Sequence, residues 1–217
     1  MTTARRVLLV ATRNLGKLAE LRTLAAQLGL APIDFASAGV VHSPEEEQLE
    51  VHATFEENAL AKAHYYHRVS GGLPTLADDS GLEVDALGGA PGVHSRRWAG
   101  AEGDEATVAA TNNAALLSRL ASATDRAARF TCVVAYVDKH RTFTCRGTVA
   151  GRIAHAPRGR HGFGYDPLFE VDELDRRTFG EVSAAEKQSV SHRARAFLQA
   201  FARLSLGTTS RGSEPSR

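Results

Sequence analysis

Apolar residues along this chain form short continuous runs that alternate with repeats at helical spacing. Residues 6–12 (RVLLVAT) are a short apolar run with several β-branched side chains, which predicts a buried strand. Leucines then recur at the spacing of one helix face, at Leu18, Leu21, Leu24 and Leu28. Gly29 supplies a stop signal for this helix. A strand, a loop and a helix are therefore predicted near the N-terminus.

Further helices are predicted from capping signals and from apolar spacing. Residues 54–57 (TFEE) are a capping box that opens a helix ending at Ser70, before a glycine pair. Residues 104–120 predict another helix, and residues 183–186 (SAAE) are a second capping box. The last helix is marked by apolar residues at Val190, Ala194, Phe197, Phe201 and Leu204.

Apolar runs between these helices predict the strands of a sheet. Residues 73–77 predict one strand, and residues 130–137 and 142–149 predict two strands joined by the polar turn DKHR. Such a pair is typical of a β-hairpin. Strands that alternate with helices predict an α/β protein, and the hairpin makes its sheet mixed.

Composition narrows the class of protein. The chain has 217 residues, of which 43% are hydrophobic and 24% charged, as in ordinary globular proteins. A net charge of +1 gives no general attraction to nucleic acid or to an acidic membrane, so neither is an expected partner. No apolar stretch approaches the ~20 residues that cross a bilayer. We expect one domain over residues 1–206 and a disordered polar tail at 207–217.

Cysteine usage and the N-terminus bear on location. Cys132 and Cys145 lie in strand-like runs, away from any Cys-x-x-Cys pattern or histidine cluster. Two buried thiols of this kind are typical of a reducing compartment. The N-terminus leads straight into the first predicted strand and lacks the apolar segment of a signal peptide. The sequence therefore predicts a cytoplasmic protein.

Residues 77–82 (ADDSGL) carry the strongest chemical signal. An apolar run ends there in two adjacent carboxylates, Asp78 and Asp79, followed by Ser80 and Gly81. Adjacent carboxylates repel each other and are costly to bury unpaired, whereas hard cations such as Mg²⁺ prefer their oxygens. One interpretation is a Mg²⁺ site where the strand ends at the lip of a cleft. The other is a solvated acidic turn, because Asp-Asp-Ser-Gly is also good turn chemistry.

The loop at residues 12–17 (TRNLGK) joins the first predicted strand to the first helix. The helix N-terminus offers free N–H donors, Thr12 and Asn14 add side-chain donors, and Lys17 adds a positive charge. This combination suits phosphate oxygens. It is not a Walker A loop, because the glycine spacing differs and no Ser or Thr follows Lys17. The alternative is an ordinary loop of an α/β protein.

Residues 162–169 (GFGYDPLF) overlap a glycine-rich loop at 159–166. Glycines let the backbone approach a flat ligand closely, and Phe163 can stack on a base. Asp166 can accept hydrogen bonds from ring N–H groups. The alternative is a tight turn whose aromatic residues lie in the core.

Lys187, His192 and Arg193 form a basic group near the C-terminus. On one straight helix Lys187 and His192 point apart, and the group is a solvated basic face. If Ser191 instead caps a new helix, the three basic residues can converge on one acceptor-rich ligand. The sequence leaves both arrangements open.

The set and order of these segments resemble the inosine triphosphate pyrophosphatase family. The resemblance covers about residues 5–205. Its motifs are TxNxxK at 12–17, TFEENAxxKA at 54–63, ADDSGLxV at 77–84, GGAPGVxS at 88–95, GFGYDP at 162–167 and EKxxxSHR at 186–193. The family hydrolyses nonstandard purine nucleoside triphosphates (XTP, ITP, dITP), so the resemblance implies release of the monophosphate and pyrophosphate.

The resemblance also implies a fold and a chemistry. The expected fold is an elongated two-lobed α/β structure around a long mixed β-sheet flanked by helices, with the nucleotide in a cleft between the lobes. The resemblance implies that the protein is a homodimer and that Mg²⁺ is its cofactor. Asp79 matches the metal-binding acid and general base, and Asp78 is expected to orient it. Lys17 and Lys62 are expected to stabilise the leaving pyrophosphate.

The residues that match the family's substrate contacts fall into four groups. They are Thr12, Arg13, Asn14, Leu15, Gly16 and Lys17 in the triphosphate loop, then Ser80, then Phe163, Gly164, Tyr165 and Asp166 in the base-stacking loop, and finally Lys187, His192 and Arg193, which grip the purine.

The chain departs from the family pattern at two points. The family usually has a glycine where this chain has Arg13, so an extra cation is expected beside the phosphates. The acidic segment is also longer here. Counting from Pro44 assigns Glu47 as the second metal ligand, whereas counting from Phe55 assigns Glu50.

Two rival functions share these features. One is a related pyrophosphatase that accepts pyrimidine triphosphates, and the other is a nucleotide sensor that does not hydrolyse. The intact pair Asp78-Asp79 argues against the sensor. A purely structural module would leave the glycine-rich loops and the basic group without a purpose.

Overall fold

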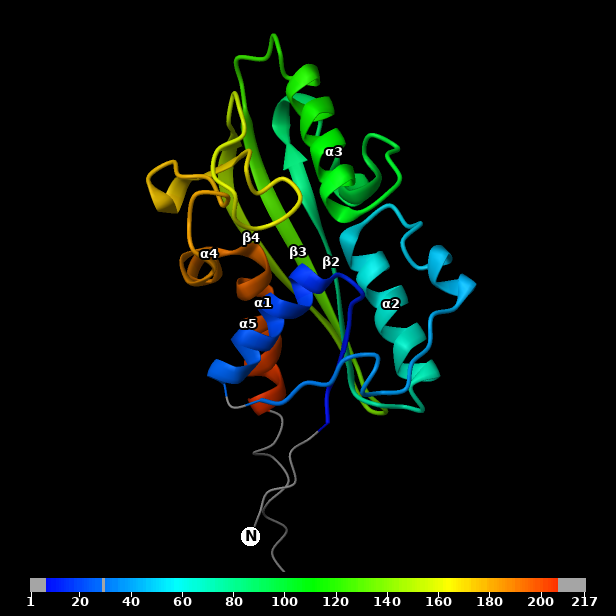
Figure 1. Ribbon diagram of the computed structural model, residues 1–217. Helices are drawn as coiled ribbons and strands as arrows, with labels where there is room; N and C mark the ends of the chain where they lie inside the picture. Colours follow the sequence, from blue (N-terminus) through cyan, green and yellow to red (C-terminus); the bar gives the residue numbers. More distant parts are fainter. Residues whose placement is uncertain (1–6, 29, 207–217) are drawn as a thin grey trace, which may run out of the picture.

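A single mixed β-sheet runs along the length of the molecule (Figure 1). The computed structural model describes residues 7–28 and 30–206, so Gly29 and the predicted tail at 207–217 lie outside the described residues. The strands, in spatial order, are β1 (Leu9–Ala11), β2 (Thr75–Val84), β3 (Ala127–Val137), β4 (Thr142–Ile153) and β5 (Phe169–Val171). β1 is parallel to β2, and the other neighbours are antiparallel. The predicted α/β class with a mixed sheet is confirmed.

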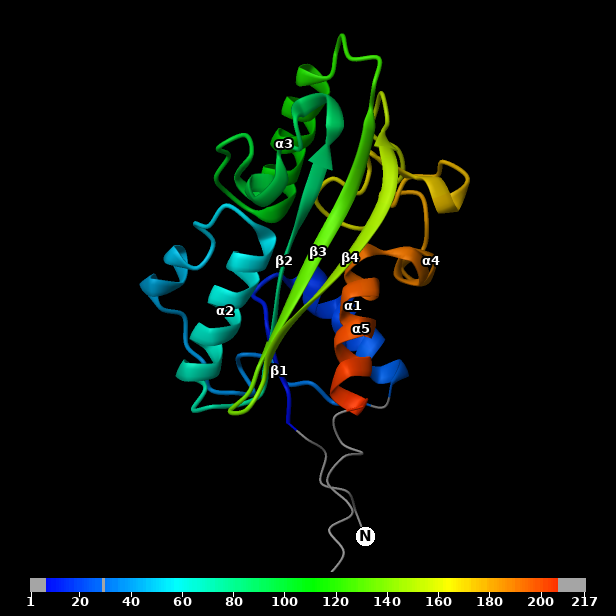
Figure 2. The same cartoon turned by 180° about the vertical axis from the view of Figure 1, so that it is seen from behind.

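Helices flank the sheet on both faces. The α-helices are α1 (Leu15–Gln27), α2 (Phe55–Val69), α3 (Glu105–Arg119), α4 (Ala184–Val190) and α5 (His192–Leu206). The described residues also form four short 3-10 helices, η1 (Pro44–Gln48), η2 (Asp85–Leu87), η3 (Gly92–Arg97) and η4 (Asp172–Leu174). The two opposite views show α2 on one side of the long strands and α1 with α5 on the other (Figures 1 and 2).

The two faces of the sheet build two separate cores because strand side chains alternate in direction. Val133 of β3 packs with Ala59 of α2, whereas the next residue, Val134, packs with Phe197 of α5. A third core lies under α3, where Leu116 packs with Leu82 from the far end of β2. In Figure 1, α3 lies beside the ends of the long strands in the upper part of the molecule. The molecule is elongated because β2 and β3 are long enough to contribute to the core under α3 as well as to the cores under α2 and α5.

Local capping signals place the helix boundaries. Thr54 and Ser183 each form the predicted capping box, and Asn14 caps α1 by accepting a hydrogen bond from the Lys17 amide at 2.8 Å. Ser191 separates α4 from α5 in extended conformation, and its hydroxyl accepts from the Ala194 amide. The alternative of one straight helix through this region is therefore wrong, and a new helix begins after Ser191.

The strand that carries the two aspartates extends well beyond the prediction. Both interpretations of Asp78 and Asp79 placed them where a strand has ended, but β2 continues to Val84 and holds them in its middle. Both residues are buried, so the solvated acidic turn is also wrong. β3 supplies backbone partners along the whole segment, with Asp79 opposite Val133. That pairing outweighs the local turn signal.

The described part of the chain contains no helix that combines the length and the apolar character required to span a bilayer. β5 was not predicted because it has only three residues. It pairs with the end of β4 at Ile153, which extends four residues past the predicted strand end at 149.

Gly81 allows η3 to pack directly on β2. A Cβ atom at this position would lie 2.3 Å from the Gly92 carbonyl oxygen and 2.4 Å from Ser95 Oγ. We expect Gly81→Ala to displace η3 and to lower the free energy of unfolding by about 1–3 kcal/mol, measured by urea denaturation. An unchanged denaturation midpoint would contradict this close packing.

Candidate functional site

A cleft of about 510 Å³ passes the middle of β2. Most of the predicted site residues line it, and they are Thr12, Arg13, Asn14, Lys17, Glu50, Lys62, Asp79, Ser80, Phe163, Gly164, Tyr165, Asp166, Lys187, His192 and Arg193. Leu15, Gly16 and Glu47 do not line it. Leu15 is 77% exposed, and Glu47 is exposed on η1. The fold thus brings together segments that are spread over the whole sequence.

Asp79 lies on the α2 side of β2. Its Oδ1 accepts a hydrogen bond from Lys62 Nζ at 3.1 Å, and its Oδ2 accepts from Asn58 Nδ2 at 3.0 Å. Burial raises the pKa of Asp79 above its ordinary value, although the Lys62 ammonium opposes the shift. The carboxyl group is therefore oriented on both oxygens and is a stronger base than an exposed aspartate. Asn58 belongs to the TFEENA motif, but its contact could not be read from the motif.

Glu50 is the second acid on this side of the cleft. Lys62 Nζ lies 2.8 Å from Glu50 Oε1 and so bridges Glu50 and Asp79. Burial would raise the pKa of Glu50, but Lys62, Lys17 and Arg97 lower it below its ordinary value. Of the two glutamates that the sequence left open, Glu50 lies beside Asp79 and Glu47 does not.

Asp78 faces the opposite side of the strand, as expected for the neighbour of Asp79. Lys17 Nζ lies 2.8 Å from Asp78 Oδ2, and Arg193 Nε lies 3.7 Å from the same oxygen. Burial alone would raise the pKa of Asp78, but Lys17 and Arg193 hold it well below its usual range. Asp78 therefore fixes two cations on the face of β2 opposite to Asp79, and the expectation that it orients Asp79 stays a prediction.

Glu20 does not line the cleft, but it binds two residues that do, and the motifs did not reveal it. It projects from α1 and forms ion pairs with Lys187 at 2.8 Å and with Arg193. Lys187 Nζ also lies 2.5 Å from Asp166 Oδ2. The available signal was spacing, because Glu20 stands one helical turn after Lys17 and so shares its face of α1. Glu20 thus holds together Lys187 and Arg193, which lie on the two helices that Ser191 separates.

One end of the cleft is aromatic. The Phe163 ring lies 4.5 Å from Lys187 Nζ and 5.6 Å from the Arg193 guanidinium carbon. It packs against Gly16, where a Cβ atom would be only 2.7 Å from the ring. Gly16 therefore shapes this end from behind the ring. Asp166 Oδ2 accepts from the Phe163 amide at 2.7 Å and holds the loop in place.

Tyr165 and Gly164 are tied to the protein itself. The Tyr165 hydroxyl donates to the Ser95 carbonyl at 2.9 Å, and the Gly164 carbonyl accepts from Asn113 at 3.1 Å. Tyr165 is buried, as the core alternative for this loop expected. Both aromatic residues of the loop line the cleft, Tyr165 as a buried core residue and Phe163 as a partly exposed one.

His192 is buried and stacks on Phe130, with ring centroids 4.8 Å apart. Burial, together with Arg193 and Lys187, lowers the pKa of His192 well below 6.5, so its ring is neutral at pH 7. Among the described residues, neither His192 Nδ1 nor Arg193 Nε has a hydrogen-bond partner. Two buried polar atoms are thus left for a ligand to satisfy.

The loop at residues 12–17, which the sequence predicts to bind phosphate, contacts both η1 and α3. Asn14 Nδ2 donates to Glu105 Oε1 on α3 at 2.7 Å. Arg13 binds Glu46 with both prongs of its guanidinium, at 2.5 and 2.6 Å, and lies over the Phe35 ring. Burial opposes ionisation of Glu46, but Arg13 and its other donors lower its pKa to about 2. The extra cation expected at Arg13 is present but is paired with this acid.

Fold and cleft together define an α/β protein whose cleft combines carboxylates, cations and an aromatic end. The chain matches the Ham1 family over residues 8–203 and belongs to it. This membership confirms the family resemblance drawn from the motifs.

Individual relatives match over nearly their whole length. A protein of Ralstonia nicotianae named dITP/XTP pyrophosphatase is 49% identical, over 93% of this chain and 98% of that protein. A protein of the same name from Mycolicibacterium paratuberculosis is 49% identical, over 87% of this chain and 91% of that protein. The solved structure of a HAM1 protein from Coxiella burnetii superposes with a TM-score of 0.78 at 37% identity, covering 92% of this chain and 98% of that one.

Neutral, buried His192 should link stability to pH. The unfolded chain takes up a proton at this ring below pH 6.5, whereas the folded chain does so only at lower pH. Its contribution is fully present above pH 6.5 and is lost as the pH falls toward the folded-state pKa. We expect His192→Phe, which keeps the stacking, to flatten the slope of unfolding free energy as the pH falls below 6.5.

Urea denaturation at a series of pH values measures this slope. His140→Gln, at an exposed position in the β3–β4 turn, is the control and should keep the wild-type slope. An unaltered slope in His192→Phe would show that the folded protein protonates this ring as readily as the unfolded chain does.

Proposed function

We propose that this chain hydrolyses nonstandard purine nucleoside triphosphates (XTP, ITP, dITP) to the monophosphate and pyrophosphate. The observation that carries this proposal is the near-half identity, over 93% of the chain, to a protein named dITP/XTP pyrophosphatase. The cleft supports it with an oriented carboxylate, cations and an aromatic end in one continuous site.

We further propose that the site takes Mg²⁺ on Asp79 and Glu50. Both acids present oxygens to the same part of the cleft, and the Lys62 ammonium now occupies the space between them. No cluster of three or more His, Cys, Asp or Glu able to hold a metal occurs among the described residues. Two carboxylates nevertheless fit Mg²⁺, which commonly combines one or two of them with phosphate oxygens and water. When bound, the ion neutralises charge on the phosphates.

Asp79 is the base in the proposed reaction, NTP + H₂O → NMP + pyrophosphate. Its raised pKa suits it to take a proton from the water that attacks the α-phosphorus. Lys62 and Asn58 hold its two oxygens and so fix the direction of proton transfer. Lys17, anchored by Asp78, supplies positive charge to the leaving pyrophosphate.

The basic group accounts for selection at the 6-position of the purine. Hypoxanthine and xanthine carry an oxygen there, which accepts hydrogen bonds from Lys187, Arg193 or His192. Adenine carries an amino group, which cannot accept a hydrogen bond from Arg193 Nε, a buried donor without a hydrogen-bond partner among the described residues. A site built to pair a polar substituent can reject the mismatched analogue by a factor on the order of 10⁴. This pairing would use Arg193 Nε and His192 Nδ1, which lack hydrogen-bond partners within residues 7–28 and 30–206.

A nucleotide panel tests the proposed function. The purified protein is incubated with ITP, dITP, XTP, GTP, ATP and pyrimidine triphosphates, in Mg²⁺ or in EDTA, and pyrophosphate and orthophosphate are measured separately. We expect Mg²⁺-dependent pyrophosphate release from ITP, dITP and XTP. Orthophosphate as the first product, a preference for pyrimidines, or binding without turnover would each contradict the proposal.

Asp79→Asn should retain the fold and lower dITP turnover by at least roughly 100-fold, because a carboxamide cannot accept the proton. Pyrophosphate release measures the rate, and circular dichroism verifies the fold. Near wild-type hydrolysis by this variant would remove Asp79 from the mechanism.

Glu50→Gln and Glu47→Gln separate the two assignments of the second metal ligand. We expect Glu50→Gln to lower kcat/KM at limiting Mg²⁺ by roughly tenfold or more, and Glu47→Gln to have little effect. The measurement is a Mg²⁺ titration of dITP hydrolysis. The reverse pattern would assign the role to Glu47.

We also propose a homodimer located in the cytoplasm. The family resemblance supports the dimer, and the two unpaired, buried cysteines support a reducing compartment. Size-exclusion chromatography with light scattering measures the assembly directly. A monomeric mass at micromolar concentration would contradict the dimer.

A further inference from the structure

Arg97, at the end of η3, binds Glu50 twice. Its Nη2 donates to the backbone carbonyl of Glu50 at 2.6 Å, and its Nη1 lies 3.4 Å from Glu50 Oε2. The other carboxylate oxygen, Oε1, is held by Lys62 at 2.8 Å. The acidic group is thus held from two sides, and Arg97 alone of these two cations also holds its backbone.

The segment that carries Arg97 is fixed by buried hydrogen bonds. Ser95 Oγ accepts from the Leu82 amide of β2 at 2.8 Å and donates to the Gly92 carbonyl at 2.6 Å. Asn112 of α3 accepts from the Ala99 amide and donates to the Arg96 carbonyl. Ser95 and Asn112 are both buried. Arg97 therefore extends from a firmly anchored backbone.

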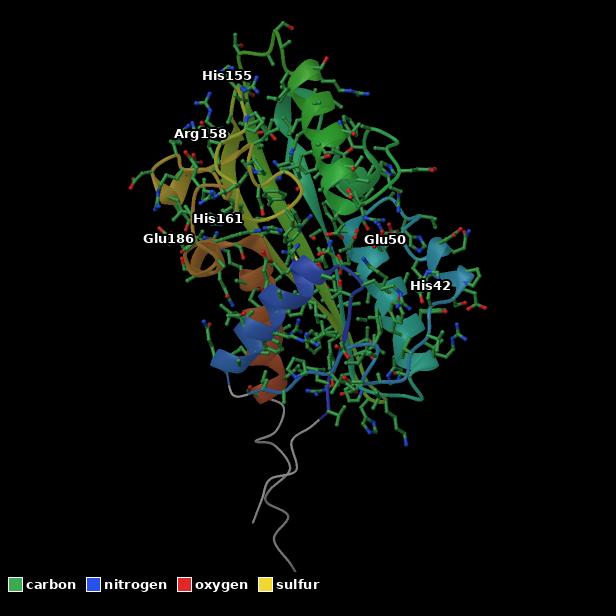
Figure 3. All side chains as sticks on the ribbon, viewed as in Figure 1. His42, Glu50, His155, Arg158, His161 and Glu186 are labelled. Atoms are coloured by element: carbon green, nitrogen blue, oxygen red, sulfur yellow. The ribbon has the colours of Figure 1, made fainter. Side chains whose placement is uncertain are left out.

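Glu50 lies in the connection between η1 and α2, outside any helix or strand. In the segment of Glu50, the Leu49 amide donates to the Glu46 carbonyl at 3.1 Å and the His52 amide donates to Asn58 Oδ1 at 3.0 Å. The Glu50 carbonyl itself is bound by Arg97. Figure 3 shows Glu50 at the end of α2 nearest α3, where the segments before α2 and after η3 meet. The place of its carboxylate thus depends on groups from outside this connection, and the guanidinium of Arg97 is the one that binds both its main chain and its side chain.

We propose that Arg97 is the positioning residue for Glu50, and this inference rests on the proposed function of the cleft. The guanidinium fork holds the backbone of Glu50 so that the carboxylate faces Asp79 and can share a Mg²⁺ ion with it. A lysine cannot reproduce this role, because its single ammonium lacks the two-pronged geometry.

The contact is too exposed to be explained by stability. The Arg97 and Glu50 side chains are 49% and 38% exposed, and ion pairs of this kind contribute little to folding. Loss of Arg97 should therefore leave the fold intact and appear as weakened metal-linked binding. Groups that orient metal ligands have this signature, with metal affinity falling when they are removed.

Binding of a nonhydrolysable nucleotide separates this role from catalysis. An α,β-imido analogue of dITP is titrated into each protein by calorimetry, in EDTA and at graded Mg²⁺ concentrations. The variants are Arg97→Met, Arg97→Lys, Glu50→Gln and the double variant Arg97→Met with Glu50→Gln. Arg68→Met is the matched control, because it removes another arginine–glutamate pair, with Glu45, away from the cleft.

We expect Arg97→Met and Arg97→Lys to require about tenfold more Mg²⁺ for half-maximal enhancement of binding, with unchanged affinity in EDTA. Arg68→Met should match the wild type. In the Glu50→Gln background, loss of Arg97 should add nothing further, because the two residues act as one unit.

Three results would overturn the role of Arg97. They are a wild-type Mg²⁺ requirement in Arg97→Met, an equal loss of affinity with and without Mg²⁺, and a full additional loss on top of Glu50→Gln. The wild-type protein tests the proposed function separately from the role of Arg97. A wild-type protein that neither binds the analogue nor hydrolyses dITP would reject both proposals together.

Discussion

The structure depends on burying two adjacent carboxylates in the middle of a paired strand. An ionised carboxylate without partners is expensive to bury, and Asp78 and Asp79 lie side by side in β2. The strand resolves the problem geometrically, because its alternation sends the two groups to opposite faces. Each face then supplies its own cations, with Lys62 on the α2 side and Lys17 with Arg193 on the other. The helices on both faces are therefore positioned by charge as well as by apolar packing.

These cations are themselves paired with a second set of acids. Glu20 holds Arg193, and Glu50 holds Lys62. Glu20 and Asp166 also hold a further cation, Lys187. The cleft consequently contains many charges whose partners are already inside the protein. A polyanion that enters must compete with these carboxylates, whereas a metal ion would bind to them. This arrangement gives a physical reason for expecting nucleotide and metal to bind together, since each compensates the charges that the other leaves unpaired.

The charge of Arg13 has a different effect in the folded protein from the one that its local motif suggests. Within its loop it is an added positive charge next to expected phosphate contacts. In the fold it is neutralised by Glu46, from an acidic segment more than thirty residues away along the chain. The longer acidic segment and the arginine thus compensate each other, although they are separate departures in the sequence. The field at this end of the cleft is therefore weaker than the sequence of the loop implies.

Local chemistry in the sequence was sufficient for the class of fold and for the caps at Thr54 and Ser183, because capping and apolar periodicity act between near neighbours. The family resemblance, carried by motifs in the sequence, indicated most of the cleft residues, Asp79 among them, and the choice between Glu47 and Glu50. Only the tertiary structure decided that β2 continues through the aspartates, that Asp78 and Asp79 face apart, and that Glu20, Asn58 and Arg97 join the site. Those outcomes depend on β3 as a pairing partner and on ion pairs between segments far apart in sequence, and no local pattern encodes either.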